Sequence, residues 1–232
     1  MRRTEGHRAG WILAGLAVVL VAALIVAAAL EHTEPVSALP PNPWTESTST
    51  PTTPPASLAP SAAALAYVFP VAGKATYARD HHDYPASDII AACGLAFRAP
   101  TSGVVLELSR SDTYDAQADD GGKRGGLYVS LAGDDGVRYY GSHLRTIPPD
   151  IVPGARVKAG AKLGEVGDTG DASVCHLHFG ISPLCAERGD WWIRRGVIWP
   201  WSYLDSWRTS RPRSPAAEIA KWQGSHGCPG AP

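Results

Sequence analysis

The chain has 232 residues, of which 44% are hydrophobic, and its 21 lysines and arginines nearly balance its 22 aspartates and glutamates. This length allows one compact domain with additional segments and leaves little room for two domains. The near-neutral charge, without a basic stripe interleaved with aromatic residues, argues against nucleic acid as a partner.

The first predicted element is a membrane span. Residues 11–30 form an uninterrupted apolar run without a charged side chain, long enough as a helix to cross the roughly 30 Å hydrocarbon core of a bilayer. Arginines precede this run and glutamates follow it, which predicts a cytoplasmic tip at residues 1–10 and an extracytoplasmic remainder. A cleaved signal peptide is the alternative. The run is longer than the apolar stretch of about 7 to 15 residues in such signals, which favours a single-pass anchor in the cell membrane.

A linker is predicted at residues 31–64, which are rich in Pro, Ser and Thr. Such a segment buries too little apolar surface to offset the entropy lost on ordering, and its clustered prolines extend the backbone. We expect a stalk that holds a folded domain away from the membrane.

The folded domain is predicted at residues 65–209, where short apolar runs alternate with Gly, Pro and Asp turns. Residues 103–108, 126–133 and 137–144 have the composition of strands, and GDDG at 133–136 is a hairpin signal. This pattern predicts an all-β fold built on an antiparallel sheet.

Two glycine-rich or acidic stretches of this domain are interpreted as turns and loops. The glycines between residues 154 and 170 fit neither phosphate-binding fingerprint, which indicates tight turns. Residues 109–126 contain several aspartates without the ligand spacing of a calcium loop, so we expect a solvated loop that flanks a cleft.

The sequence SVCHLHFGIS at residues 173–182 places two histidines in a run that otherwise resembles a buried strand. Because side chains alternate along a strand, His176 and His178 share one face. The opposite, core-facing side carries Cys175, Leu177, Phe179 and Ile181. The Cα atoms of alternate residues lie about 6.5 to 7 Å apart, so one imidazole can bind a metal while the other contacts the metal's water.

Three further histidines of the domain, His81, His82 and His143, lie in two other short stretches. A catalytic zinc takes three protein ligands from His, Asp or Glu and leaves one position for water. One histidine of the doublet at 81 and 82, Asp88 and one histidine of the H-L-H pair would supply that set.

These stretches together resemble peptidase family M23, the zinc metallopeptidases that include lysostaphin and the LytM-like peptidoglycan endopeptidases. The resemblance covers most of residues 65–207, and VKAGAKLGEVGDTG and HLHF are its most specific parts. WWIRRGVIWPWSYLDSW resembles the end of this domain in a membrane-tethered actinobacterial subset. The resemblance implies a compact antiparallel β-sheet domain of the lysostaphin type, related to barrel-sandwich folds, with a groove across the sheet. It also implies Zn²⁺ as cofactor and a peptidoglycan peptide as substrate.

The resemblance assigns roles to five positions. The metal ligands correspond to a histidine of the doublet, Asp88 and His178. His143 and His176 correspond to the two further histidines that activate water and stabilise the tetrahedral intermediate.

The first ligand departs from the family's usual His-x-x-x-Asp spacing, because Tyr84 stands four residues before Asp88. His82 precedes this aspartate by six residues and His81 by seven. We prefer His82 as the ligand, with His81 as the alternative and Asp83 as a third candidate.

The predicted function is hydrolysis of peptide bonds in peptidoglycan stems or cross-bridges by a metal-activated water. The alternative is a catalytically inactive relative that binds cell wall or regulates another hydrolase. A serine or cysteine nucleophile is not supported, because no G-x-S-x-G sequence is present and two neighbouring residues of a strand point to opposite faces. This applies to Ser142 with His143 and to Cys175 with His176.

Four cysteines in an extracytoplasmic domain predict one or two structural disulfides, with three full connectivities possible. They are Cys93, Cys175, Cys185 and Cys228. The tryptophan-rich residues 191–207 are expected to pack around the sheet, with a sugar-stacking rim as the alternative. Residues 210–232 are a predicted tail with a short helix over 215–222.

Overall fold

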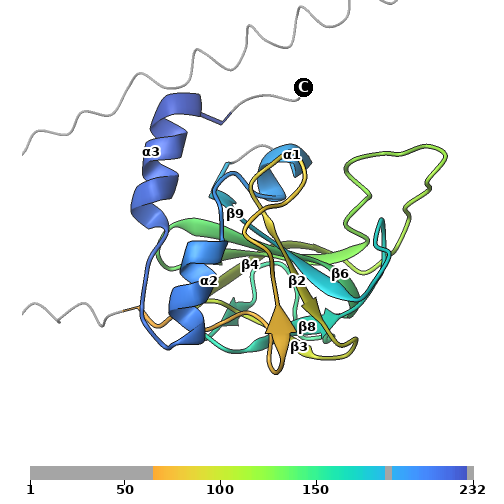
Figure 1. The fold of residues 1–232 in the computed structure, drawn as a ribbon, viewed down its shortest axis with the longest axis horizontal. Coiled ribbons are helices and arrows are strands. Elements are labelled where there is room, and N and C mark those ends of the chain that lie inside the picture. Colours follow the sequence, from red (N-terminus) through yellow and green to blue (C-terminus); the bar gives the residue numbers. More distant parts are fainter. Residues whose placement is uncertain (1–64, 186–189, 229–232) are drawn as a thin grey trace, which may run out of the picture. The chain divides into compact units, whose positions relative to one another are not determined.

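The computed structural model describes residues 65–185 and 190–228. The predicted cytoplasmic tip, membrane span and linker lie outside the described residues. Within the described ranges, no helix is long and apolar enough to cross a bilayer. These ranges form an antiparallel sheet with three helices, which are α1 (Trp191–Arg194), α2 (Trp201–Arg208) and α3 (Ala216–His226) (Figure 1).

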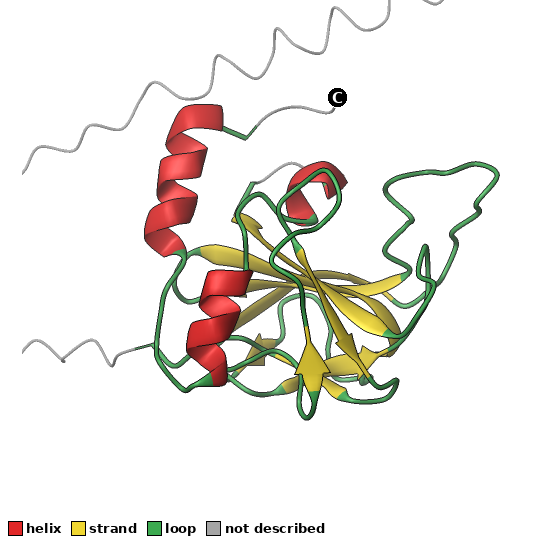
Figure 2. Cartoon of the chain, in the orientation of Figure 1, coloured by secondary structure: helices red, strands yellow, loops and turns green. Residues whose placement is uncertain are grey.

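One mixed-length sheet contains all nine strands of the described chain. The strands are β1 (Ala75–Thr76), β2 (Ser87–Ala91), β3 (Ala96–Arg98), β4 (Gly103–Ser109), β5 (Leu127–Gly133), β6 (Val137–Thr146), β7 (Arg156–Val157), β8 (Lys162–Val166) and β9 (His176–Pro183). Their order is β1-β2-β9-β6-β5-β4-β7, and β8 pairs with β3 and β6 outside this path. The strands cross the middle of the domain, α2 and α3 lie along one side, and the long loop of residues 110–126 lies on the opposite side (Figure 2).

The structure confirms the predicted all-β architecture. Strands β4, β5 and β6 begin within one residue of the predicted ranges. The hairpin between β5 and β6 closes with a hydrogen bond of 2.9 Å from Gly136 N–H to the Gly133 carbonyl. Gly136 has φ +76°, a conformation that glycine adopts without steric cost.

Strand β9 shows the predicted alternation. Leu177, Phe179 and Ile181 are fully buried in the hydrophobic core, whereas His176 and His178 point to the other face. Burial of each of these large apolar side chains stabilises the fold by about 1.5–3 kcal/mol. Cys175 lies just before the strand, half-buried against the core.

The tryptophan-rich run forms α1 and α2, which the sequence pattern did not predict. Trp207 is buried and contacts Tyr139 and Phe179, with ring centroids 6.1 and 6.2 Å away. Packing around the sheet is therefore confirmed for this residue. Trp191 instead lines the cleft described below.

The cysteines form two disulfides, one of the three connectivities that the sequence allows. Cys93 pairs with Cys175, which joins the segment after β2 to the residue before β9. Cys185 pairs with Cys228, which joins the end of β9 to the end of α3. The predicted tail is thus covalently attached to the domain.

Candidate metal centre

A cleft of about 580 Å³ lies over the face of the sheet that carries the histidines of β9. Its lining comes from β2, β6 and β9, from the loop of residues 110–126, and from α1. The expectation that this loop flanks a cleft is confirmed.

Strand register brings the first site residues together. Strand β9 lies between β2 and β6, and Asp88 of β2 is directly opposite His178. Directly opposed residues of antiparallel strands point to the same face. The carboxylate and the imidazole therefore meet above the sheet.

Asp88 is the centre of the cluster. Its Oδ1 lies 3.1 Å from His178 Nδ1, 3.5 Å from His81 Nε2 and 3.7 Å from His176 Nε2. Burial alone would raise the pKa of Asp88, but hydrogen bonds and charge from His178 and His81 outweigh it. They hold the pKa of this carboxyl well below its usual range, so it stays a carboxylate.

His178 is oriented by the backbone of the turn after α1. Its Nε2–H donates to the Arg195 carbonyl at 2.9 Å, which leaves the Nδ1 lone pair facing Asp88. Gly180 permits this approach, because a Cβ at that position would lie 2.3 Å from the Arg195 oxygen. A lone pair and a carboxylate oxygen 3.1 Å apart require a proton or a metal ion between them.

Both histidines of the doublet lie near Asp88, and each of the three residues offers a ligand atom within 4.8 Å of the others. The side chain of His81 is only 4% exposed, whereas His82 and Asp83 are exposed. His81 Nδ1–H donates to the Tyr84 carbonyl at 3.2 Å, which turns Nε2 toward Asp88. The geometry therefore favours His81, the alternative of the sequence analysis, over His82.

His176 and His143 form a second pair beside the carboxylate, with ring centroids 4.5 Å apart. His176 Nδ1–H donates to the Val174 carbonyl at 2.8 Å, and His143 Nδ1–H donates to the Thr169 carbonyl at 2.7 Å. Burial, followed by the nearby charges of His178 and His176, lowers the pKa of His143 to about 3. The His143 ring is therefore neutral at pH 7, with an unprotonated Nε2.

His143 reaches the cleft through an irregularity in β6. The register of β5 with β6 shifts here, and His143 has φ +62°, in the left-handed region. Ser142 and His143 consequently both line the cleft. The prediction that they point to opposite faces is wrong, because it assumed a regular strand.

Residues 83–188 match the family model of peptidase family M23. This part of the chain belongs to that family. It is a family of peptidases with some inactive members, and M23 peptidases are generally zinc-dependent. The membrane-tethered actinobacterial type stays a prediction.

Several solved structures resemble the M23 domain. A structure assigned to peptidase M23 from Pseudomonas aeruginosa is 22% identical, covers 60% of this chain and 50% of its own, and has a TM-score of 0.45. The catalytic domain of lysostaphin from Staphylococcus simulans is 23% identical, with coverages of 57% and 93% and a TM-score of 0.44. A structure assigned as a LytM glycyl-glycine endopeptidase from Ruminococcus gnavus is 21% identical, with coverages of 65% and 63% and a TM-score of 0.47.

The chain thus spans about half the length of the Pseudomonas protein. No curated protein matches the chain. At these identities and TM-scores the solved structures carry no argument about function, so the family assignment rests on the match of residues 83–188.

Asp88 provides two donor separations that fit a zinc ion, one to His178 and one to His81, which lies just before the residues matched by the family model. Two donors that are each about 2.0–2.1 Å from a tetrahedral zinc lie about 3.3 Å apart. The separations of Asp88 Oδ1 from His178 Nδ1 and from His81 Nε2, 3.1 and 3.5 Å, bracket this value. Two imidazoles and one carboxylate also match the donor types of a catalytic zinc site with one open position.

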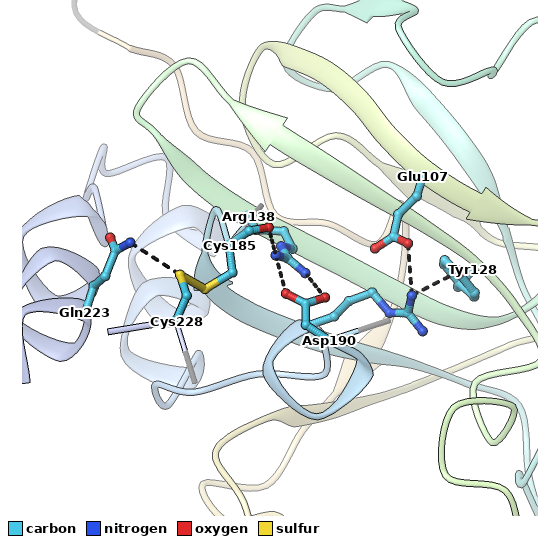
Figure 3. A network of polar contacts seen from close by, with 8 residues as sticks. Glu107, Tyr128, Arg138, Cys185, Asp190, Gln223 and Cys228 are labelled. Carbon is cyan, nitrogen blue, oxygen red and sulfur yellow. Dashed lines mark hydrogen bonds and ion pairs between the residues drawn. A yellow bond between two sulfur atoms is a disulfide. The ribbon is translucent and has the colours of Figure 1, made fainter. Parts of the chain in front are cut away.

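A buried polar network holds α1 against the sheet of the M23 domain (Figure 3). Arg138 of β6 donates to both carboxylate oxygens of Asp190, at 2.9 and 2.7 Å, and to the Cys185 carbonyl at 3.1 Å. Arg194 of α1 donates to Glu107 and to the Tyr128 hydroxyl, both at 3.0 Å. Asp190 and Arg194 stand at the two ends of α1, directly before Arg195. The network therefore fixes the backbone of Arg195, whose carbonyl accepts from His178.

Sequence reasoning missed this network. Arg138 and Asp190 are 52 positions apart, and no local pattern pairs them. The available signal was Arg138 itself, which stands between Val137 and two tyrosines in the predicted strand. A buried arginine needs an acidic partner.

Proposed function

We propose that the chain is a zinc metalloendopeptidase that hydrolyses peptide bonds in peptidoglycan stems or cross-bridges. One observation carries the proposal: Asp88 Oδ1 lies within 3.5 Å of a ring nitrogen of both His178 and His81, at the edge lengths of a tetrahedral zinc site. The match to family M23 supports the peptidase activity.

The ligands of the proposed site are His81 Nε2, Asp88 Oδ1 and His178 Nδ1. A bound Zn²⁺ would act as a Lewis acid on the scissile carbonyl and lower the pKa of a water ligand toward about 7. The carboxylate brings one negative charge, and the two imidazoles bind in their neutral form because each has its proton on the nitrogen that donates to a backbone carbonyl.

His176 and His143 are the proposed proton carriers. His176 Nε2 lies 3.7 Å from Asp88 Oδ1 and carries no proton in the tautomer that its Nδ1 contact selects. It can accept the proton of the attacking water and return it to the leaving amine. His143 packs against this ring and, with its Nε2 also unprotonated, provides a second acceptor in the cleft.

We also propose that residues 11–30 anchor the chain in the cell membrane and that residues 31–64 form the stalk. The uncharged apolar run and the Pro, Ser and Thr content support this arrangement. It would place the peptidase domain on the outer side of the membrane, where peptidoglycan lies.

The test combines metal analysis with digestion of purified peptidoglycan by the full chain. Wild type is expected to bind one zinc per chain and to release new amino groups from the peptidoglycan. His178→Ala is expected to lose both, whereas the control His226→Ala, in an exposed residue at the end of α3, is expected to keep both. A wild-type chain that binds peptidoglycan but holds no zinc and cuts no peptide would refute the enzyme and support the non-catalytic module.

A further inference from the structure

Three arginines line the cleft, and two of them are paired with acidic side chains. Arg124 donates to both carboxylate oxygens of Asp119, at 2.8 and 2.6 Å. Arg194 donates to Glu107. For Arg195, the described residues provide no carboxylate within ion-pair distance, so its charge faces the cleft without an acidic partner in residues 65–185 and 190–228.

The Arg195 side chain is held by aromatic rings. Its guanidinium carbon lies 3.8 Å from the centre of the Tyr84 ring and 5.1 Å from that of Trp191. Stacking on a ring face leaves the N–H groups at the edge of the guanidinium plane for hydrogen bonds. Arg195 is half-buried, and its Nε–H is buried without an acceptor among the described residues.

The backbone of Arg195 is fixed beside the proposed ligand set. Its carbonyl accepts the hydrogen bond from His178 Nε2, and its N–H donates to the Trp191 carbonyl at 3.1 Å. Gly196 follows with φ +132°, where a Cβ would lie 2.3 Å from the Pro85 carbonyl. The Arg195 side chain therefore extends from a fixed backbone that is hydrogen-bonded directly to His178, a proposed zinc ligand.

We propose that Arg195 is the carboxylate receptor of this cleft, and that the substrate peptide carries a free carboxylate close to the bond that is cut. The carboxylate comes from an acidic side chain or from a chain terminus. The inference rests on the proposed function, because it takes the cleft to be a peptide-binding site. A planar guanidinium held edge-outward matches both oxygens of a carboxylate, which the point charge of a lysine does not.

The experiment measures binding rather than turnover. The full chain is stripped of metal with 1,10-phenanthroline, which carries no carboxylate, and then dialysed. Alanine hexapeptides with a blocked N-terminus, labelled with a BODIPY dye that has no free carboxylate, are titrated by fluorescence anisotropy. One pair compares a central glutamate, in both enantiomers, with glutamine; a second pair compares a free C-terminal carboxylate with its amide.

At least one carboxylate peptide is expected to bind wild type about tenfold more tightly than its uncharged match, as a charge-assisted hydrogen bond provides. The pair that shows this difference identifies the source of the carboxylate. Arg195→Gln is expected to abolish the difference, and the control Arg211→Gln, in an exposed residue after α2, is expected to retain it.

Equal binding of both members of each pair by wild type would overturn the inference, and so would a tenfold difference that survives Arg195→Gln. If Arg195→Gln does not fold, as judged by its thermal transition, Arg195→Lys decides instead. A difference in affinity below threefold between the carboxylate peptide and its uncharged match supports recognition by the planar guanidinium, and an unchanged difference refutes it. Because the protein is metal-free, a chain without peptidase activity can still show the discrimination. An active enzyme that does not discriminate refutes only the receptor.

Discussion

The buried ion pair of Arg138 and Asp190 provides a test of how the site is supported. The two side chains are 3% and 5% exposed and share two hydrogen bonds. Replacing Asp190 by Ala leaves the guanidinium charge buried, with the Cys185 carbonyl as its remaining described acceptor. Loss of one partner of such a pair costs about 3–5 kcal/mol. We therefore expect Asp190→Ala to lower the free energy of unfolding by this amount.

Urea unfolding of the metal-free protein, followed by circular dichroism, measures the change. The control is Asp134→Ala, which breaks the ion pair with Arg156, whose side chain is 64% exposed. An exposed pair contributes at most about 1 kcal/mol. The double variant Arg138→Met/Asp190→Leu removes both charges and is expected to be more stable than Asp190→Ala. Equal losses in Asp190→Ala and Asp134→Ala would refute the reasoning.

Three further predictions concern the site and the core. Gly180→Ala places a Cβ against the Arg195 carbonyl, so we expect zinc affinity to fall at least about tenfold in a competition titration, as for other changes to the partners of metal ligands; unchanged affinity would contradict the proposed orientation of the imidazole. His81→Ala is expected to abolish zinc binding and His82→Ala to preserve it, and the reverse result would restore the preference for His82. Burial raises the pKa of Tyr139, so the unfolded chain loses a proton above about pH 10 that the folded chain keeps, and stability falls as pH rises past this value. Tyr139→Phe should reduce that slope by about 1.4 kcal/mol per pH unit in urea titrations, and an unchanged slope would exclude this tyrosine as its source.

The strands and their faces were predictable because alternation is a local property. In β9, every second residue from Leu177 is apolar, and the structure buries those side chains. The choice between His81 and His82 was not predictable. It depends on a turn in which the Tyr84 carbonyl accepts from one ring and orients it, and a count of residues to Asp88 contains no information on such a contact.

Helices α1 and α2 escaped prediction for a related reason. Their four- and eight-residue lengths are too short for helical periodicity to appear above the tryptophan-rich composition. They are stabilised by tertiary contacts, such as the burial of Trp207 and the pairing of Asp190 with Arg138. The wrong prediction that Ser142 and His143 point to opposite faces has the same origin, since the register shift lies in the pairing of β6 with β5 and is not visible in the sequence of β6 alone.

The orientation of the four imidazoles follows one rule that leaves no trace in a motif. Each ring has one nitrogen within hydrogen-bond distance of a backbone carbonyl, and these carbonyls belong to Tyr84, Thr169, Val174 and Arg195. A carbonyl can only accept, so each of these contacts selects the neutral tautomer whose other nitrogen is a lone pair. In these tautomers the four rings and the Asp88 carboxylate form a set of donor atoms without a proton to share. A cation at Asp88 stabilises such an arrangement. Because backbone carbonyls orient the rings, the arrangement does not depend on the side chains of the four residues that carry these carbonyls.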